Sequence, residues 1–323
     1  MTDYQIPADF LEVLRKKYDD AVSNNFVLYN GENAVHEYEK VALGALTVHF
    51  QLTLLTSLVH RPESGNRNEN PFEKPEPELT VVPSFGPAGE FRIVFNKFPV
   101  VPMHFLLVTT KFASQNTPLT PSELFASFQI LKKIEKSEAG VSKWFAFFNS
   151  GPESGASQPH KHIQFMTEPS DSQFKSIADT IAEQLSQFDA YSESPSAAEP
   201  FSAKGIPFAH FLIKLPTGAE IYEMRLATSF SALLQRTLSV LKLNDQAGIS
   251  YNFIMTTRYM FMVPRSKSKF EDRIGINSCG FQGLVLCKNE ELFEFVKKTG
   301  PLNILSSVSL PNIPDDREGV SYY

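Results

Sequence analysis

The sequence predicts an α+β fold in which antiparallel sheets are flanked by helices and two half-repeats are fused into one body. Segments with apolar residues at helical spacing alternate with short runs rich in β-branched and aromatic residues. A stretch rich in Ser, Ala, Pro and Glu, residues 189–205, interrupts this alternation and predicts a linker. Strands and helices recur in similar order on both sides of it. We therefore expect halves over roughly 25–188 and 206–300, each with an antiparallel sheet, although no residue-by-residue repeat is evident.

A helix is predicted before the first half, because Phe10, Leu14 and Tyr18 recur at helical spacing between about Pro7 and Asn24. Residues 47–54 alternate between apolar and polar side chains, which predicts a half-buried strand. The same periodicities, with flanking Pro and Gly residues, predict the remaining elements of this half. These are a mobile polar loop over 61–78, strands near 79–82, 91–96 and 104–110, a helix over 121–138, paired strands over 143–149 and 160–167, and a helix over 172–188.

After the linker the alternation of strand and helix patterns starts again. The elements predicted here are a strand over 206–215, a long helix over 219–243, a strand or hairpin across 249–263, a strand over 283–287 and a short helix over 290–298. The whole chain, residues 1–323, is predicted to be one domain.

The composition is that of an ordinary globular chain, and the net charge of the chain excludes some classes of binding partner. The 323 residues are 42% hydrophobic, and 30 Lys and Arg against 36 Asp and Glu give a net charge of −6. This charge argues against nucleic acid or an anionic membrane as a partner. The longest apolar stretch, 98–108, contains two prolines, and no secretory signal is evident. We therefore expect a monomeric cytoplasmic protein, with the nucleus as an alternative location.

The segment that points to chemistry is 151–164, Gly-Pro-Glu-Ser-Gly-Ala-Ser-Gln-Pro-His-Lys-His-Ile-Gln. On a strand, successive side chains alternate between faces, so His160, His162 and Gln164 project from one face. Burying two imidazoles and an amide in a row is costly without a purpose. The upstream glycines and serines could bring N–H groups and hydroxyls close to an anion. The segment predicts an anion-binding loop beside two histidines, with Lys161 on the opposite face as a solvated surface charge.

Three interpretations of the histidine pair remain open on the residues alone. The two side chains could simply be polar residues on a partly exposed strand. They could bind a metal, but a metal site needs three or four ligands, and neither Cys279 nor Cys287 is near in sequence. The two cysteines form no Cys-x-x-Cys pair and are predicted to be small buried thiols. Finally, a neutral imidazole is a competent nucleophile when its other ring nitrogen is held as N–H by an acceptor.

The run GASQPHKHIQ is similar to the active-site signature of the fungal diadenosine tetraphosphate (Ap4A) phosphorylases, or ATP adenylyltransferases. These enzymes form a branch of the histidine-triad (HIT) superfamily related to galactose-1-phosphate uridylyltransferase. Four further segments resemble the family and occur in the same order along nearly the whole chain: LTLLTSLVHRP, NPFEKPEPELTV, FRIVFNKFP and INSCGFQGLVLCKNE. The resemblance implies a HIT-like fold.

The resemblance also implies roles for individual residues. His162 would attack the α-phosphorus of the dinucleotide and carry the adenylyl group. His160 would support it by holding the loop and the tautomer of His162, and Gln164 would bind phosphate oxygens. Gln164 stands where a hydrolase of this superfamily has a third histidine, and an amide cannot relay a proton at neutral pH. The substrate-binding residues implied are Arg61, Asn96, Lys97, Asn149, Ser154, Gly155, Ala156, Ser157, Asn277, Ser278, Cys279, Leu284 and Lys288.

The activity implied is phosphorolysis of Ap4A by inorganic phosphate to ATP and ADP through an adenylyl-histidine intermediate. Mg²⁺ or Mn²⁺ could assist on the substrate phosphates, and no structural metal is expected. No GxxxxGK[ST], GxGxxG or GxSxG motif is present, so neither a P-loop NTPase nor a dehydrogenase nor a serine hydrolase is indicated. Two alternatives remain, a metal-dependent dinucleoside polyphosphate hydrolase and a nucleotide-binding protein without activity.

Overall fold

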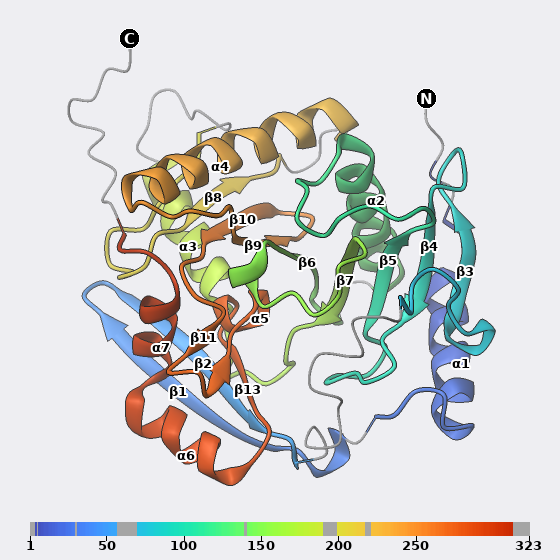
Figure 1. Ribbon diagram of the computed structural model, residues 1–323, viewed down its shortest axis with the longest axis horizontal. Coiled ribbons are helices and arrows are strands. Elements are labelled where there is room, and N and C mark those ends of the chain that lie inside the picture. The colour runs from blue at the N-terminus through green and yellow to red at the C-terminus, as the bar shows by residue number, and fades with distance from the viewer. Residues whose placement is uncertain are drawn as a thin grey trace.

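Eight antiparallel strands form the central sheet of the protein (Figure 1). The computed structural model describes residues 4, 6–29, 31–56, 70–138, 141–189, 199–216 and 221–312. The strand order is β3-β4-β5-β7-β6-β9-β10-β8. The strands in that order are Thr80–Phe85, Phe91–Phe95, Phe105–Thr109, His162–Thr167, Trp144–Ser150, Tyr251–Met255, Tyr259–Pro264 and Phe211–Lys214. The sheets predicted for the two halves are thus joined into one, because β6 of the first half pairs with β9 of the second.

One face of this sheet is covered by three helices, α1 (Phe10–Ser23), α2 (Pro121–Glu138) and α4 (Glu223–Leu243). Their apolar sides and the inward side chains of the strands form one hydrophobic core. In it Phe105 of β5 stacks on Phe165 of β7, with ring centroids 4.7 Å apart. Aromatic side chains at alternate strand positions therefore fix the helix-covered face of β7, and its other face is left for the histidines.

A second core lies on the opposite face, under a small three-stranded sheet. The sheet consists of β1 (Val35–Leu43), β2 (Leu46–Leu54) and β13 (Leu284–Cys287). β1 and β2 form an antiparallel hairpin, and β13 pairs with β2 in parallel, so this sheet also combines the two halves. Around it and along its edges lie the helices α3 (Ile177–Asp189), α5 (Ser278–Phe281), α6 (Glu290–Thr299) and α7 (Pro301–Val308), with the short strands β11 (Lys269–Phe270) and β12 (Ile274–Gly275).

The structure contains the two half-repeats that the sequence predicts. The unit β5-α2-β6-β7 has the sheet order β5-β7-β6, and the unit β8-α4-β9-β10 has the order β8-β10-β9, so the two meet at β6 and β9. A short residue repeat accompanies them. His104-Phe105-Leu106-Leu107 begins β5, and His210-Phe211-Leu212-Ile213 begins β8. The sequence therefore does contain a local repeat, contrary to expectation, although it is only four residues long.

Most predicted elements are confirmed, and the differences have local causes. The helix expected over 172–188 begins at Ile177, and the strand expected over 206–215 is reduced to Phe211–Lys214. This strand is shorter because residues 204–205 form a turn and Phe208 makes only an isolated bridge, with Pro311, before β8 begins. The strand β1 and the helix α7 are not anticipated. Of the expected loop over 61–78 and the linker over 189–205, residues 61–69 and 190–198 lie outside the described residues.

None of the described helices is both long enough and apolar enough to cross a membrane.

Candidate active site

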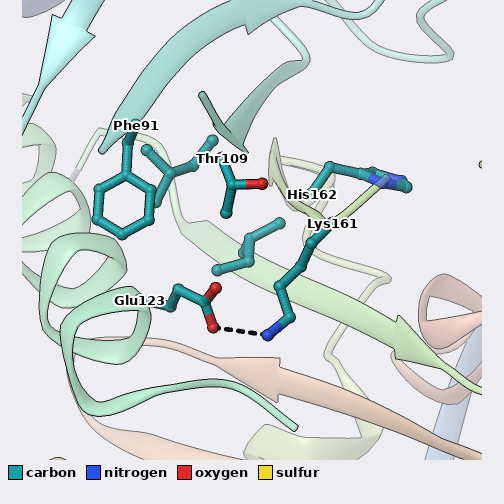
Figure 2. Close-up of a pocket in the computed structure, with 7 residues that line it drawn as sticks. Phe91, Thr109, Glu123, Lys161 and His162 are labelled. Atoms are coloured by element: carbon teal, nitrogen blue, oxygen red, sulfur yellow. Dashed lines mark hydrogen bonds and ion pairs between the residues drawn. The ribbon is translucent and has the colours of Figure 1, made fainter. Parts of the chain in front are cut away.

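The two histidines lie where the long β6–β7 connection enters the sheet. His162 is the first residue of β7, and His160 makes an isolated β-bridge with Ser114. The alternation predicted for this segment is confirmed. Lys161 points to the helix-covered face, while Figure 2 shows His162 directed away from it. Both imidazoles are buried, with 1% and 3% of the residue exposed for His160 and His162.

Backbone geometry fixes the tautomer of His162. Its Nδ1 lies 2.8 Å from the carbonyl oxygen of His160, and because a carbonyl only accepts, Nδ1 carries the proton. The lone pair is therefore on Nε2. Burial lowers the pKa of His162 from 6.5 to about 4, so the ring is neutral at pH 7. A neutral imidazole with a free Nε2 lone pair is the form required of a nucleophile.

His160 holds the tautomer of His162 and the loop through different atoms. Its Nε2 donates to the carbonyl oxygen of Thr109 at 2.8 Å, and its Nδ1 lies 2.9 Å from Nδ2 of Asn70. Burial lowers its pKa as well, so it too is held neutral. The carbonyl of His160, rather than its ring, holds the tautomer of His162, while the ring anchors the loop to β5 and to the Asn70 segment.

Phe72 lies against the face of β7 that carries His162. Its ring centroid is 5.0 Å from that of His162 and 6.0 Å from that of His160. It also packs on a small apolar cluster formed by Val94, Leu106 and Val108. This cluster and Phe72 keep the surroundings of His162 apolar, which accounts for the direction of its pKa shift.

Gln164 follows His162 on the same face of β7, and His104 fixes its amide. Nε2 of His104 lies 3.1 Å from Oε1 of Gln164, and Nδ2 of Asn96 lies 3.4 Å from Nδ1 of His104. If Asn96 donates to Nδ1, His104 carries its proton on Nε2 and donates to Gln164. The NH₂ group of Gln164 is then the end available to donate to a phosphate oxygen.

The loop between β6 and β7 has a backbone conformation that needs glycine at two positions. Gly151 has φ +88° and Gly155 has φ +78°. A Cβ on Gly151 would lie 2.1 Å from the carbonyl oxygen of Ile249, and one on Gly155 would lie 2.6 Å from that of Ile276. The loop can therefore lie close to the second half only because these side chains are missing. Gly155, Ala156 and Ser157 remain partly or fully exposed beside the histidines.

Asn149, at the end of β6, is oriented by residues of the second half. Its Oδ1 accepts from Nδ2 of Asn252 at 2.7 Å, and from both the backbone N and the Oγ of Ser278 at 3.0 and 2.7 Å. Three donors on one oxygen identify that atom as the carbonyl end of the amide. The NH₂ end of Asn149 makes no hydrogen bond to the residues that the structure describes.

Gln115 joins Asn149 to His162 of β7. Its Nε2 donates to the carbonyl oxygens of Asn149 and His162 at 2.9 and 3.3 Å, and its Oε1 accepts from the His162 N–H at 2.8 Å. Gln115 is buried, so it links the ends of β6 and β7 without contact with solvent.

Lys161 is not the surface charge that the sequence predicts. Its ammonium, only 3% exposed, lies 3.0 Å from Oε2 of Glu123 and donates to the carbonyl of Pro118 at 2.8 Å. Figure 2 shows this pair in a narrow gap on the helix-covered face, away from His162. The gap has no room for a water molecule. Lys161 therefore clamps the start of β7 to α2, and it cannot meet a substrate on the His162 face.

Comparison with known proteins identifies the family. Residues 38–183 match the Ap4A phosphorylase N-terminal domain, and residues 204–311 match the ATP adenylyltransferase C-terminal domain. Protein APA1 of Saccharomyces cerevisiae (strain ATCC 204508 / S288c) is 33% identical over 320 residues, which cover 95% of this chain and 96% of the relative. This chain belongs to the Ap4A phosphorylase family.

Other members of the Ap4A phosphorylase family are similar to a comparable degree. Diadenosine 5',5'''-P1,P4-tetraphosphate phosphorylase 2 of the same yeast is 33% identical over 273 residues, covering 80% of this chain and 82% of the relative. Crystal structures of yeast Ap4A phosphorylase Apa2 in complex with AMP and with Ap4A are 29% identical and superpose with a TM-score of 0.80. They match 97% and 96% of this chain and the whole of the Apa2 chain.

In this member of the Ap4A phosphorylase family, the structure brings two of the predicted catalytic residues together with part of the predicted substrate-binding set. The hydrogen bonds described above connect His160, His162, Asn149 and Ser278 into one network. Ser154 differs from expectation, because it is fully buried and its hydroxyl donates to the carbonyl of Gly151 at 2.6 Å. Its hydroxyl therefore closes the loop and does not face a phosphate.

The other predicted residues are more dispersed. Lys97 is paired with Glu76 at 2.7 Å, and Arg61 lies outside the described residues. Asn277 accepts from the N–H of Cys279 and caps α5, and burial raises the pKa of the Cys279 thiol to about 12. Leu284 and Lys288 are placed on β13 and just after it, on the small sheet.

A metal site at the histidine pair is not favoured by their bonding. Both ring nitrogens of His160 and Nδ1 of His162 are engaged by protein atoms, so among the described residues Nε2 of His162 is the ring nitrogen of this pair that has no hydrogen-bond partner. Across the described ranges, no group of three or more His, Cys, Asp or Glu side chains is placed to hold a metal ion.

Sequence reasoning missed several residues of the network, chiefly Gln115, Asn252, Thr109, Asn70 and Arg265. For two of them a signal exists. Asn252 is a lone polar residue inside an apolar strand, and Asn70 begins the segment NPFEKPEPELTV that resembles the family. A polar side chain in a buried strand needs partners, so Asn252 could have been singled out on that ground, and Asn70 by the resemblance of its segment.

Proposed function

We propose that this protein catalyses phosphorolysis of Ap4A by inorganic phosphate, with ATP and ADP as products. The observation that carries the proposal is the neutral His162, whose Nδ1–H is held by a backbone carbonyl and whose Nε2 lone pair is free. Family membership gives the substrate class, because the yeast relatives include a named Ap4A phosphorylase and Apa2 binds Ap4A and AMP.

The reaction would proceed in two displacements at the α-phosphorus. In the first, Nε2 of His162 forms a bond to phosphorus and the bond to the bridging oxygen breaks, so that ATP leaves. In the second, a phosphate oxygen attacks the adenylyl group, the P–N bond breaks and ADP leaves. The proton on Nδ1 stays bound to the carbonyl of His160 throughout, and it stabilises the positive charge that the ring acquires while it carries the adenylyl group.

Neutral donors would bind the phosphate oxygens close to His162. We assign this role to the NH₂ groups of Gln164 and Asn149, whose oxygens are occupied by other partners. The exposed backbone of Gly155, Ala156 and Ser157 would contribute N–H groups. Donors that are fixed before the substrate binds need no reorganisation as charge develops in the transition state.

The remaining predicted residues are proposed to bind the outer parts of the substrate: Arg61, Asn96, Lys97, Asn277, Ser278, Cys279, Leu284 and Lys288. Lys97 would have to leave its ion pair with Glu76 in order to bind phosphate. This ion pair is exposed, and exposed ion pairs cost little free energy to break. If Mg²⁺ or Mn²⁺ takes part, phosphate oxygens would be its main ligands, given the donor groups that the described residues offer.

We further infer that residues 1–323 act as a single catalytic domain and as a monomer, since strands of both halves form the same sheet. A cytoplasmic location remains our expectation.

Product analysis tests the function. Purified protein is incubated with Ap4A, with and without inorganic phosphate, and nucleotides are separated by ion-exchange chromatography. The proposal expects ATP and ADP in equal amounts, formed only with phosphate. Formation of AMP and ATP, or of two ADP, at a rate that phosphate does not change would identify a hydrolase. A parallel reaction with EDTA shows whether a divalent cation on the phosphates is needed.

A further inference from the structure

Arg265, which ends β10 on its C-terminal side, is one of the largest fully buried side chains. Its guanidinium is surrounded by neutral acceptors and by the ring of Phe281, whose centroid lies 5.2 Å away. The hydrogen bonds are from Nη1 to Oδ1 of Asn252 and to the carbonyls of Ile276 and Ser154, from Nη2 to the carbonyl of Lys267, and from Nε to the carbonyl of Val308.

This charge has no direct countercharge among the residues that the structure describes. Every hydrogen-bond acceptor of Arg265 is neutral, and Glu153, whose charge favours the protonated form, uses its Oε2 to accept from the Ser268 N–H at 2.7 Å. Burial lowers the pKa of Arg265 to about 9, which leaves it protonated at pH 7. Buried charges in proteins are almost always paired, so an unpaired guanidinium requires an explanation.

The position of Arg265 explains why its buried charge is unpaired. Its bonds to Ser154 and Ile276 reach the backbone next to Gly155 and next to Asn277, which border the proposed substrate. Its bond to Asn252 reaches Asn149 in one further step, because Asn252 donates to Oδ1 of Asn149. The charge therefore lies one residue behind the surface that would hold the phosphates.

We propose that Arg265 is a buried positioning residue whose fixed positive charge is the countercharge for the phosphate chain of the substrate. This inference rests on the proposed function. Arg265 does not touch the substrate; it holds the loop and Asn149 in place and attracts the phosphates through a layer of protein. Such an attraction is stronger across protein than across water, because the protein interior screens charge less. It also explains how a chain with net charge −6 can favour a polyanion.

Two variants separate charge from positioning. Arg265→Lys keeps the charge and loses most of the hydrogen bonds, whereas Arg265→Gln loses the charge and keeps part of the hydrogen bonding. Arg258→Gln is the matched control. Arg258 precedes β10 at its other end and pairs with Asp179, which retains Lys143 as a partner after the substitution. It removes the same charge from the same strand without changing the proposed site.

Binding is measured by calorimetry with inorganic tripolyphosphate and with AMP. Neither has an adenylyl group with a good leaving group, so neither is consumed by the enzyme. We expect Arg265→Gln to weaken tripolyphosphate binding on the order of tenfold or more and AMP binding by clearly less, since AMP has a single phosphate. Arg265→Lys should recover much of the tripolyphosphate affinity, and Arg258→Gln should bind both ligands as the wild type does.

Other outcomes overturn the inference. The inference is wrong if Arg265→Gln binds tripolyphosphate as tightly as the wild type, or if it loses the same factor of affinity for AMP as for tripolyphosphate. It is also wrong if Arg265→Lys binds tripolyphosphate as weakly as Arg265→Gln, or if the wild type does not bind tripolyphosphate. If Arg265→Gln does not fold, the affinities of Arg265→Lys for tripolyphosphate and for AMP decide whether the charge or the hydrogen-bonding geometry of Arg265 matters. Failure of the proposed function is a separate result, because it is seen as absence of phosphate-dependent ATP and ADP formation by the wild type.

Discussion

Strands β7 and β10 occupy equivalent places in the two halves of the central sheet and differ completely in chemistry. The His-Phe-Leu repeats at the start of β5 and β8 place Val108 and Lys214 in equivalent positions. Val108 lies opposite His162, and Lys214 lies opposite Tyr259. Tyr259 is thus the counterpart of His162, and by the same register Phe261 is the counterpart of Gln164.

The second half has a tyrosine instead of a histidine at this position, and β10 is buried along its entire length. Its polar residues instead hold the first half in place, through Asn252 and Ser278 on Asn149 and through Arg265 on the loop. Under the proposed function, one copy of the duplicated unit carries the reacting group and the other orients its ligands. The predictions below test this division.

The largest effect is expected at the two equivalent positions. His162→Ala removes the nucleophile and should lower the rate of Ap4A phosphorolysis by at least about a thousandfold. Tyr259→Phe, the matched control, should leave the rate within a few fold. Both are checked by ATP and ADP formation at saturating phosphate. Near-wild-type turnover by His162→Ala would show that the chemistry lies elsewhere.

Asn252 tests the supporting role of the second half. Asn252→Leu removes the amide that orients Asn149 and binds Arg265, so kcat/KM should fall roughly ten- to a hundredfold. The free energy of unfolding should fall by about 2–3 kcal/mol, because buried partners lose their hydrogen bonds. Asn244→Ala, in an asparagine that caps α4, is the control and should leave kcat/KM unchanged. Equal kinetics for the two variants would remove the second half from the account.

The buried ion pair behind β7 should matter more for stability than for chemistry. Lys161→Met leaves Glu123 buried without its cation and should lower the free energy of unfolding by about 3–5 kcal/mol. The activity of the remaining folded protein should change only a few fold. Lys297→Met, which removes an exposed cation, should lower the free energy of unfolding far less. Urea denaturation measures both, and equal costs would contradict the burial of Lys161.

The smallest effect is expected from moderate acid. The pKa of His162 is lowered to about 4, so its neutral form, which has the free lone pair, predominates above that pH. kcat/KM should therefore show no loss from protonation of His162 as pH falls from 8 to 5, and should decline only as pH approaches 4. Rates are measured in brief assays with circular dichroism to verify folding. A decline centred near 6.5 would mean that the imidazole is not desolvated as described.

Most of the helices and strands, and the segment 151–164, could be predicted from the sequence because both depend on local patterns of residues. The alternation of β2 and of 160–165 follows directly from the period of a strand. The strand β1 was not predicted because its residues are mostly exposed or half-buried and show no regular alternation. The eight-residue helix α7 is too short to show a clear period.

The supporting network could not be predicted because its contacts are distant in sequence. Asn252 and Asn149 are separated by 103 positions, and Arg265 and Ser154 by 111. Lys161 was mistaken for a surface residue because nothing near it in sequence indicates its pairing with Glu123, 38 positions away. Local patterns report the face on which a side chain lies, but not which other element covers that face.

The most direct test of the account is to trap the intermediate. Wild-type protein is mixed with Ap4A in the absence of phosphate, and intact-mass measurement is followed by peptide mapping at neutral pH. The account predicts one adenylyl group per chain, attached to His162, which is lost on addition of phosphate with release of ADP. His162→Ala should show no adduct. An active wild type that forms no adduct, or forms one at another residue, would contradict the assignment of His162 as the nucleophile.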